Sequence, residues 1–264
     1  MTIKDQINRN IDLSDNPRRI ISLVPSISEL LIDLGIGDRL VGRTKFCVLP
    51  ESISSNSSRI VGGTKSVHFD RIHELQPDLI ICNKEENTVE IVEELEKLYP
   101  VYVSNVQTVH SALDMITDVG LMTNLKDEAD KLIERIESSR EAWHNKSLKT
   151  SKVIYLIWKN PWMSIGRDTF IFHMLEEAKF ESVVYDLRYP TLELSEMEKS
   201  SADFLFLSSE PFPFKEKDIQ ELSNQIGKTQ PVLVDGTYFS WYGSRMATAY
   251  QYFEDLHNIL GETQ

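Results

Sequence analysis

The sequence predicts an α/β protein of two lobes, each built on a mostly parallel β-sheet, joined by one long helix. Short β-branched runs alternate with amphipathic segments in both halves of the 264-residue chain, which is typical of parallel strands connected by helices. From about residue 109 to residue 149 the alternation stops and no strand candidate occurs. The length suits two lobes of about 100 to 150 residues each.

The first lobe is predicted to span residues 1–123. Its first strand, at 18–24, leads into a helix through ELLIDLG, which either Ser26 or Ser28 caps and Gly35 ends. The other predicted elements are strands at 38–44, 59–61, 78–82 and 101–105, and helices at 69–77, 87–99 and 108–124.

A helix over about residues 125–147, within a joining segment 124–149, is predicted to connect the lobes. Asn124 with Asp127 offers a cap at its start. Its apolar residues fall on one face at helical spacing: Leu125, Ala129, Leu132, Ile136 and Trp143. Such a helix is about 35 Å long.

The second lobe is predicted to span residues 150–264, where the alternation resumes. Its predicted elements are strands at 152–158, 203–208 and 231–236, and helices at 168–180, 193–201, 218–226 and 245–260. The stretch DGTYFSWYGSRM, residues 235–246, separates the last strand from the last helix. Its glycines and serines favour a loop, so four aromatic residues in it call for an explanation.

Composition excludes several classes of protein. The 41 acidic residues against 28 basic ones give a net charge of −13, which repels phosphate backbones and excludes nucleic acid as a partner. No apolar run reaches the roughly 18 residues of a membrane span. The start, MTIKDQINRNIDLSDNP, has no apolar leader region, so the protein is cytoplasmic if Met1 is the native start. We expect a monomer.

Two cysteines are too few for a disulfide framework or a zinc site. Cys82 ends the apolar run DLIIC and is expected to be buried. Whether it pairs with Cys47 is open from the sequence.

Motifs for catalysis are weak, so we expect no enzyme, no catalytic residue and no catalytic cofactor. Gly35-Ile36-Gly37 lacks the third glycine of a dinucleotide fingerprint and follows a helix. His68 and His73 are five residues apart, which places them on different sides of a helix, so no metal site is expected.

Loops after several predicted strands carry the candidate ligand-binding residues. In an open α/β sheet, the loops at the carboxyl ends of strands line the ligand crevice, and aromatic side chains with polar tips suit a bulky ligand. The candidates are Tyr238, Trp241, Tyr242, Arg245, Trp158, Trp162, Arg43, Lys45, Thr64 and Lys65. The alternative for the last loop is that Phe239 and Trp241 only fill the end of the sheet.

Three stretches resemble the helical-backbone (class III) periplasmic-binding-protein family: RIISLVPSISELLIDLGIGDRLVGRT, RIVGGTKSVHFDRIHELQPDLII and IGRDTFIFHMLEEAKF. Its members deliver cobalamin, ferric siderophores or haem to ABC importers. The resemblance covers about residues 17–258. It implies two Rossmann-like lobes joined by one rigid helix, with the ligand cleft between them, and a periplasmic or extracytoplasmic location.

Within the family, NKEENTVEIVEEL is similar to the vitamin B12-binding branch. That branch places an aromatic residue close to Tyr238 and a Ser-Arg or Pro-Arg pair like Ser244-Arg245 at the start of the last helix. Thr64 stands where the cobalamin binder has a tryptophan. This departure implies either a weaker contact or a ligand other than cobalamin.

The resemblance also implies that one acidic residue on each lobe docks on arginines of the ABC permease. Asp70 matches the first position, whereas Glu193 and Glu196 both remain candidates for the second. The alternative is that such an acid only complements a helix dipole. The missing leader is a second departure, because family members are exported or lipid-anchored.

These observations favour a non-enzymatic substrate-binding protein of an ABC-type importer that holds a bulky metal-containing ligand. A corrinoid is the first expectation, since its neutral side-chain amides suit an acidic protein. The alternatives are a ferric-siderophore or haem binder, and a cytoplasmic cofactor-binding protein or chaperone on the same scaffold.

Overall fold

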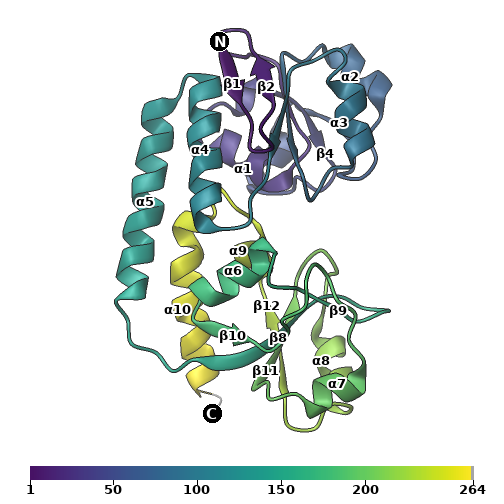
Figure 1. The fold of residues 1–264 in the computed structure, drawn as a ribbon, viewed down its shortest axis with the longest axis vertical. Coiled ribbons are helices and arrows are strands. Elements are labelled where there is room, and N and C mark those ends of the chain that lie inside the picture. The colour runs from purple at the N-terminus through teal and green to yellow at the C-terminus, as the bar shows by residue number, and fades with distance from the viewer. Residues whose placement is uncertain (263–264) are drawn as a thin grey trace. The chain divides into compact units, whose positions relative to one another are not determined.

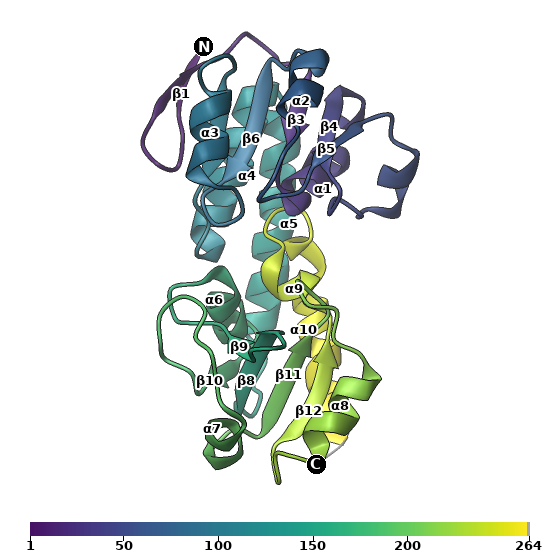
Figure 2. The same cartoon turned by 90° about the vertical axis from the view of Figure 1, so that its right-hand side faces the viewer.

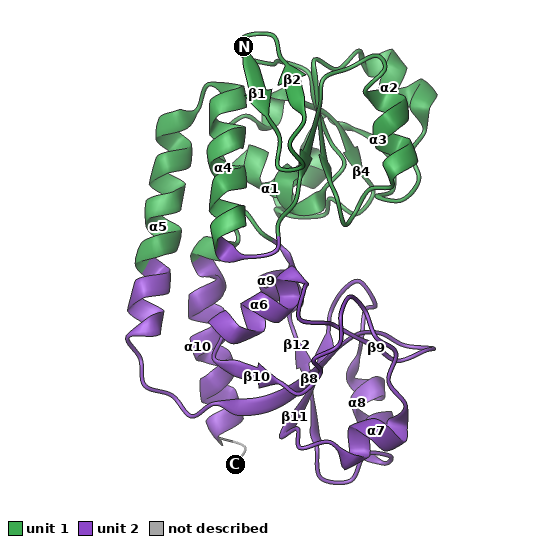
Figure 3. Cartoon of the chain, viewed as in Figure 1, with its two compact units in different colours: residues 1–106, 110–138, 242–247 green, residues 107–109, 139–241, 248–264 purple. Residues whose placement is uncertain are grey.

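The computed structural model describes residues 1–262 of the chain, which form two compact units (Figure 3). Unit 1 comprises residues 1–106, 110–138 and 242–247, and unit 2 comprises residues 107–109, 139–241 and the chain from residue 248 on. Each unit has its own sheet. The domain boundaries at residues 123 and 149 remain predictions.

Unit 1 contains a five-stranded parallel sheet in the order β5-β4-β3-β6-β7. Its strands are β3 (Ile20–Ser22), β4 (Leu40–Thr44), β5 (Arg59–Gly62), β6 (Leu79–Asn83) and β7 (Val101–Ser104). The order reverses between β3 and β6, so this is the topological switch point of the sheet.

Helices cover both faces of the unit 1 sheet (Figures 1 and 2). The helices are α1 (Pro25–Asp33), α2 (Phe69–Leu75), α3 (Val89–Leu95) and α4 (Val109–Thr123), and two short 3₁₀ helices lie at Gly37–Arg39 and Glu51–Ser55. α2 and α3 bury Ile72 and Leu95 against Ile21 and Ile80 of the sheet, whereas α1 and α4 lie on the opposite face.

The predicted end of α1 is confirmed, but its predicted start is wrong. Gly35 has a φ of 83°, the left-handed conformation that ends helices with a glycine. Ser26 and Ser28 lie inside the helix, because Pro25 occupies its first turn and Val24 precedes it without a side-chain cap. Proline suits that position, since its fixed φ is helical and its missing N–H has no partner there to lose.

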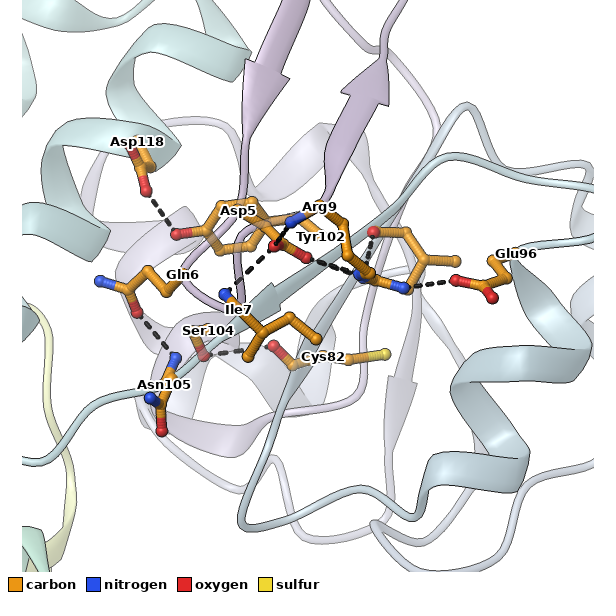
Figure 4. A network of polar contacts seen from close by, with 11 residues as sticks. Asp5, Gln6, Ile7, Arg9, Cys82, Glu96, Tyr102, Ser104, Asn105 and Asp118 are labelled. Carbon is orange, nitrogen blue, oxygen red and sulfur yellow. Dashed lines mark hydrogen bonds and ion pairs between the residues drawn. The ribbon is translucent and has the colours of Figure 1, made fainter.

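Residues before the first sheet strand form a hairpin that the sequence did not predict. β1 (Thr2–Lys4) pairs antiparallel with β2 (Asn10–Asp12). Buried Asp5 accepts hydrogen bonds from Arg9, whose guanidinium also donates to the Val101 carbonyl at 2.9 Å (Figure 4). Polar side chains thus fasten the hairpin to the edge strand β7, which explains why hydrophobic periodicity gave no sign of it.

Unit 2 contains four parallel strands in the order β10-β8-β11-β12, with the short strand β9 antiparallel beside β8. These strands are β8 (Ser151–Trp158), β9 (Met163–Ser164), β10 (Phe180–Ser182), β11 (Phe204–Ser208) and β12 (Gln230–Val234). The switch point lies between β8 and β11.

The helices of unit 2 also flank its sheet (Figure 1). They are α6 (Phe170–Glu177), α7 (Leu194–Lys199), α8 (Glu216–Ser223), α9 (Thr237–Ser240) and most of α10 (Met246–Glu262). The helix predicted to reach residue 180 ends at Glu177, and Lys179 has a φ of 62°. The short strand β10, which begins at the last residue of the predicted helix, was not predicted.

The predicted long helix is confirmed as α5 (Lys126–His144), which is shorter than expected. Ala129, Leu132, Ile136 and Trp143 are all buried, as their spacing predicted. The boundary between the two units falls inside it, after Ser138. Its last turns are held in unit 2, where the Trp143 ring N–H donates to the Glu177 carbonyl at 2.7 Å.

Cys47 and Cys82 are both buried and free, so they do not pair.

No helix in residues 1–262 combines the length and the apolar character that crossing a bilayer requires.

Candidate functional site

The switch point of unit 1 is filled by the return segment, which we define as residues 242–247. The buried Tyr242 hydroxyl lies 3.4 Å from a Glu86 carboxylate oxygen, just after β6. Gly243 has a φ of 109°, and a Cβ there would lie 3.6 Å from the Ser26 carbonyl of α1. The return segment therefore lies against the loop ends of β3 and β6.

An ion pair fixes the return segment to α1. The Arg245 guanidinium donates to both carboxylate oxygens of Glu29, one at 3.0 Å. The Glu29 side chain is only 6% exposed. Burial raises the pKa of Glu29 even though Arg245 opposes that shift. The positive charge of Arg245 is thus largely compensated inside the protein.

Beside the switch point, β4 and β5 carry the other predicted residues of unit 1. Arg43 turns toward its own loop, donating to the Ser58 hydroxyl and the Cys47 carbonyl, each at 3.1 Å. Lys45 is exposed, with its ammonium 5.0 Å from the centre of the Phe46 ring. Arg43 therefore supports the loop, while Lys45 and Phe46 face solvent.

The loop after β5 is tied to the loop after β6. The Thr64 carbonyl accepts a 2.9 Å hydrogen bond from Asn87, and the Lys65 ammonium donates to the Glu85 carbonyl at 2.6 Å. Gly62 has a φ of 140°, and a Cβ at this position would lie 2.5 Å from the Ser66 carbonyl oxygen, so both its backbone conformation and its surroundings favour glycine. These bonds hold Thr64 and Lys65 at the carboxyl edge of the sheet.

The switch point of unit 2 carries a group of aromatic rings, of which Trp158 is exposed. Trp158 ends β8, is 41% exposed and meets Phe212 edge to face, with ring centres 5.6 Å apart. Trp162 stacks on Phe214 at an interplanar angle of 8°. Lys159 lies 5.3 Å from the centre of the Trp162 ring. These contacts hold both tryptophan rings in place.

The aromatic stretch at 235–246 is partly helical rather than a plain loop, since it contains α9. Phe239 is completely buried, as the filling alternative predicted, and Trp241 is buried with its ring N–H 2.7 Å from a Glu210 carboxylate oxygen. Tyr238 stacks on Tyr252 with ring centres 4.4 Å apart. Tyr238 is half-buried, whereas Phe239 and Trp241 are buried.

Sequence reasoning missed a second exposed apolar group in unit 2. The chain after β10 pairs with the chain after β9, where Gly166 donates to the Arg188 carbonyl at 2.7 Å. Tyr185, Leu187 and Tyr189 are exposed on it. The signal available was two tyrosines and a leucine at alternate positions before Pro190.

The predicted docking acids lie at helix starts within their own units. Asp70 is exposed in the first turn of α2. Glu193 precedes α7, and its backbone N–H donates to a carboxylate oxygen of Glu196 at 2.7 Å. Both acids take part in a capping box at the start of α7, and both are exposed.

Two open pockets lie away from these residues. One of about 680 Å³ is lined by residues 9–12 and 96–101, and one of about 510 Å³ by residues around α6 and β10. Neither contains a predicted site residue. Within residues 1–262 we find no cluster of three or more His, Cys, Asp or Glu side chains suited to a metal ion.

Comparison with known proteins places these features in a family. The profile of a family described as "Periplasmic binding protein" matches residues 20–233. An uncharacterised ABC transporter substrate-binding lipoprotein of Bacillus subtilis is 25% identical over 199 residues, 70% of this chain and 62% of its own length. The vitamin B12-binding protein of Vibrio campbellii is 27% identical over 52% of this chain. The matches thus span only about half to three fifths of these relatives.

Solved structures share the fold. The periplasmic vitamin B12 binding protein of Vibrio cholerae has a TM-score of 0.75 at 17% identity and covers 93% of this chain and 98% of its own. The petrobactin-binding protein of Bacillus subtilis has a TM-score of 0.77 at 19% identity, covering 97% of both chains. At such identities the likeness concerns the fold and leaves the ligand open.

Proposed function

Because the chain belongs to the periplasmic binding protein family, we propose that it is a non-enzymatic substrate-binding protein of an ABC-type importer. Its ligand is a bulky metal-containing compound. The observation that carries this proposal is the pair of tryptophans at the unit 2 switch point, Trp158 and Trp162. Held by Phe212 and Phe214, they offer a rigid aromatic surface of the kind that large flat ligands need.

Each unit offers proposed ligand contacts at the carboxyl edge of its own sheet. From unit 2, the contacts are Trp158, Trp162 and Tyr238. From unit 1, they are Lys45, Thr64 and Lys65, with Tyr242 and Arg245 of the return segment. Arg43 and Trp241 support their loops through inward hydrogen bonds.

A corrinoid fits this charge pattern best. Arg245 is paired with Glu29, and Arg43 is bonded within its loop, so few cations remain for an anionic chelate. A neutral ligand avoids that shortage, because it needs hydrogen bonds and ring contacts rather than counter-ions. The named ligands of two relatives, vitamin B12 and petrobactin, make a ferric siderophore the second candidate.

The proposed transport role adds a location and a partner. The ligand-loaded protein docks outside the cytoplasm on an ABC permease through Asp70 of unit 1 and one exposed acid at the start of α7 in unit 2. That acid is either Glu193 or Glu196, because the two share one capping box. Exposed acids of this kind supply steering and register more than affinity.

Titration of the purified protein tests the binding role. Cobalamin, haem and a ferric hydroxamate are added separately while tryptophan fluorescence is followed. We expect saturable quenching with cobalamin, because Trp158 is exposed beside the proposed ligand. Fluorescence that stays unchanged with all three compounds contradicts the proposed function.

A further inference from the structure

A buried asparagine lies where three segments of unit 1 meet. Asn87, just before α3, is only 5% exposed. Its Oδ1 accepts from the Asn83 backbone N–H at 2.8 Å. Its Nδ2 donates to the Leu23 carbonyl at 3.2 Å and to the Thr64 carbonyl at 2.9 Å. An asparagine amide has two donor hydrogens and one acceptor oxygen, so both hydrogens and the oxygen are used.

These partners fix the orientation of the Asn87 amide. A backbone carbonyl can only accept and a backbone N–H can only donate, so the flipped amide would place Oδ1 against two carbonyl oxygens. Buried polar groups need their partners. An aspartate has the same shape but no donor when it is ionised, so it cannot serve the Leu23 and Thr64 carbonyls.

The three partners come from strands that are not all neighbours. Leu23 directly follows β3, Asn83 ends β6, and Thr64 lies in the loop after β5. The strand β5 is at the edge of the sheet, and β4 separates it from β3. Strand pairing alone therefore does not hold the loop after β5 at the switch point between β3 and β6. The Asn87 side chain supplies that connection.

The turn that carries Asn87 is itself closed by hydrogen bonds. Asn83 Oδ1 accepts from the backbone N–H groups of Glu85 and Glu86 at 2.8 and 3.1 Å. The Asn87 backbone N–H donates to the Asn83 carbonyl at 3.0 Å. The same turn receives the Lys65 ammonium at the Glu85 carbonyl. Asn87 thus links a well-defined turn to a loop that has few contacts of its own with the switch point.

We infer that Asn87 is the positioning residue for the ligand-binding edge of unit 1. It holds Thr64 and Lys65 at the switch point, so that these residues need not be ordered when a ligand binds. This inference rests on the proposed function, which assigns Thr64 and Lys65 to ligand contact. The bond from Lys65 to Glu85 is exposed, where water competes, so Asn87 supplies the larger part of the constraint.

The test compares Asn87→Ala and Asn87→Asp with Asn56→Ala as the matched control. The Asn56 side chain also bonds two backbone groups of unit 1, donating to the Gly37 carbonyl and accepting from the Ser58 N–H, each at 2.8 Å. It lies before β5, at the amino end of that strand. The control therefore loses similar bonds at the opposite edge of the sheet.

Hydrogen exchange in the free protein measures whether the loop is held. The Gly63 N–H donates to the Ser66 carbonyl at 2.7 Å and reports on the loop. We expect about 5-fold faster exchange of this amide in Asn87→Ala, the value of one hydrogen bond. Asn87→Asp should exchange at least as fast at neutral pH, despite its wild-type shape, and Asn56→Ala should match the wild type.

Two results of this measurement overturn the inference. One is wild-type exchange at Gly63 in both Asn87 variants. The other is equal acceleration in Asn56→Ala, because the loop then follows the overall stability of the protein rather than Asn87.

A second readout needs no substitution and covers the case in which the Asn87 variants do not fold. Both side-chain amide hydrogens of Asn87 are hydrogen-bonded, so in the wild-type protein they should exchange with water more slowly than those of the exposed Asn145. Nuclear magnetic resonance resolves the two sites. Equal exchange of the two side chains contradicts the assigned role of Asn87.

Titration with cobalamin separates this inference from the proposed function. Asn87→Ala should bind about 10-fold more weakly, because Thr64 and Lys65 must then be ordered on binding, and Asn56→Ala should bind as the wild type does. If the loop loosens but affinity stays at the wild-type value, Asn87 is only structural, and the binding function stands. If the wild type binds no probe, the proposed function fails, while exchange at Gly63 still shows whether Asn87 holds the loop.

Discussion

The two switch points of the molecule differ in the kind of side chain that they carry. In unit 1 the crevice between β3 and β6 is filled by the return segment, with a buried ion pair and buried hydroxyls. In unit 2 the ends of β8 and β11 present tryptophan and phenylalanine rings, and Trp158 is 41% exposed. The two units thus present different chemistry at their switch points: aromatic rings in unit 2 and a buried ion pair in unit 1.

The largest expected effect concerns the polar side of this comparison. Arg245→Ala leaves the Glu29 carboxylate buried and unpaired, which typically costs about 3–5 kcal/mol. We expect the free energy of unfolding to fall by that amount in denaturant titrations. The exchanged pair Glu29→Arg with Arg245→Glu should recover part of the loss. A loss below about 1 kcal/mol for Arg245→Ala contradicts the structural role of this pair.

The next effect concerns the aromatic side. Trp158→Ala removes the most exposed ring of the unit 2 switch point, and central aromatic residues are worth about 2 kcal/mol or more in binding. We therefore expect about 30-fold weaker binding of cobalamin by calorimetric titration, with little change in stability. Trp143→Phe, in the buried face of α5, is the control and should change stability but not affinity. If Trp158→Ala binds cobalamin as tightly as the wild type does, the ligand does not contact Trp158.

Two buried carboxylates, one in each unit, are expected to make the stability of the protein depend on pH. Burial raises the pKa of Glu29, and Arg245 does not outweigh it. Burial acts in the same direction on Glu177 of unit 2, but hydrogen bonds from Arg140 and His144 outweigh it and lower its pKa. The pKa values of the two carboxylates are therefore shifted in opposite directions.

The pH dependence of stability should differ in sign between these two groups. The contribution of Glu177 is present above its ordinary pKa of 4.5 and is lost as pH falls through its lowered value. The contribution of Glu29 is present below 4.5 and is lost as pH rises through its raised value. Each effect is about 1 kcal/mol per unit of pKa shift.

The free energy of unfolding of Glu29→Gln and Glu177→Gln, measured across acidic pH, tests this difference in sign. The stability difference from wild type should shrink on acidification for Glu177→Gln and shrink on raising pH for Glu29→Gln. Parallel pH profiles for the two variants contradict the assigned shifts.

The smallest effect concerns the exposed acids outside both switch points. Asp70→Asn and Glu193→Gln should change the unfolding free energy by no more than about 0.5 kcal/mol and leave ligand affinity unchanged. Their expected effect is slower association with the permease at low salt, measured with the transporter in nanodiscs. Glu196→Gln is measured beside Glu193→Gln, because the two acids share the capping box of α7. Wild-type association by Asp70→Asn, Glu193→Gln and Glu196→Gln contradicts the docking proposal.

Much of the fold was predictable where one periodicity dominates. The buried stripe of α5 and the glycine stop at Gly35 follow from local rules. The antiparallel hairpin before residue 13 and the strand β10 were not predictable, because polar contacts such as Asp5–Arg9 hold the first and the second is only three residues long.

The candidate site was predictable in part. Strand-end loops with aromatic residues led to Trp158 and Trp162, since carboxyl ends of parallel strands share one edge. The pairing of Arg245 with Glu29 joins residues 216 positions apart, so no local pattern shows it.

The most direct test of ligand binding is the visible spectrum of the protein after exposure to an equal mixture of cobalamin, haem and a ferric hydroxamate, followed by gel filtration and mass analysis of the retained compound. Retention of the corrinoid in a one-to-one ratio is the predicted result. A protein fraction that emerges colourless, with none of the three compounds attached, contradicts the central claim.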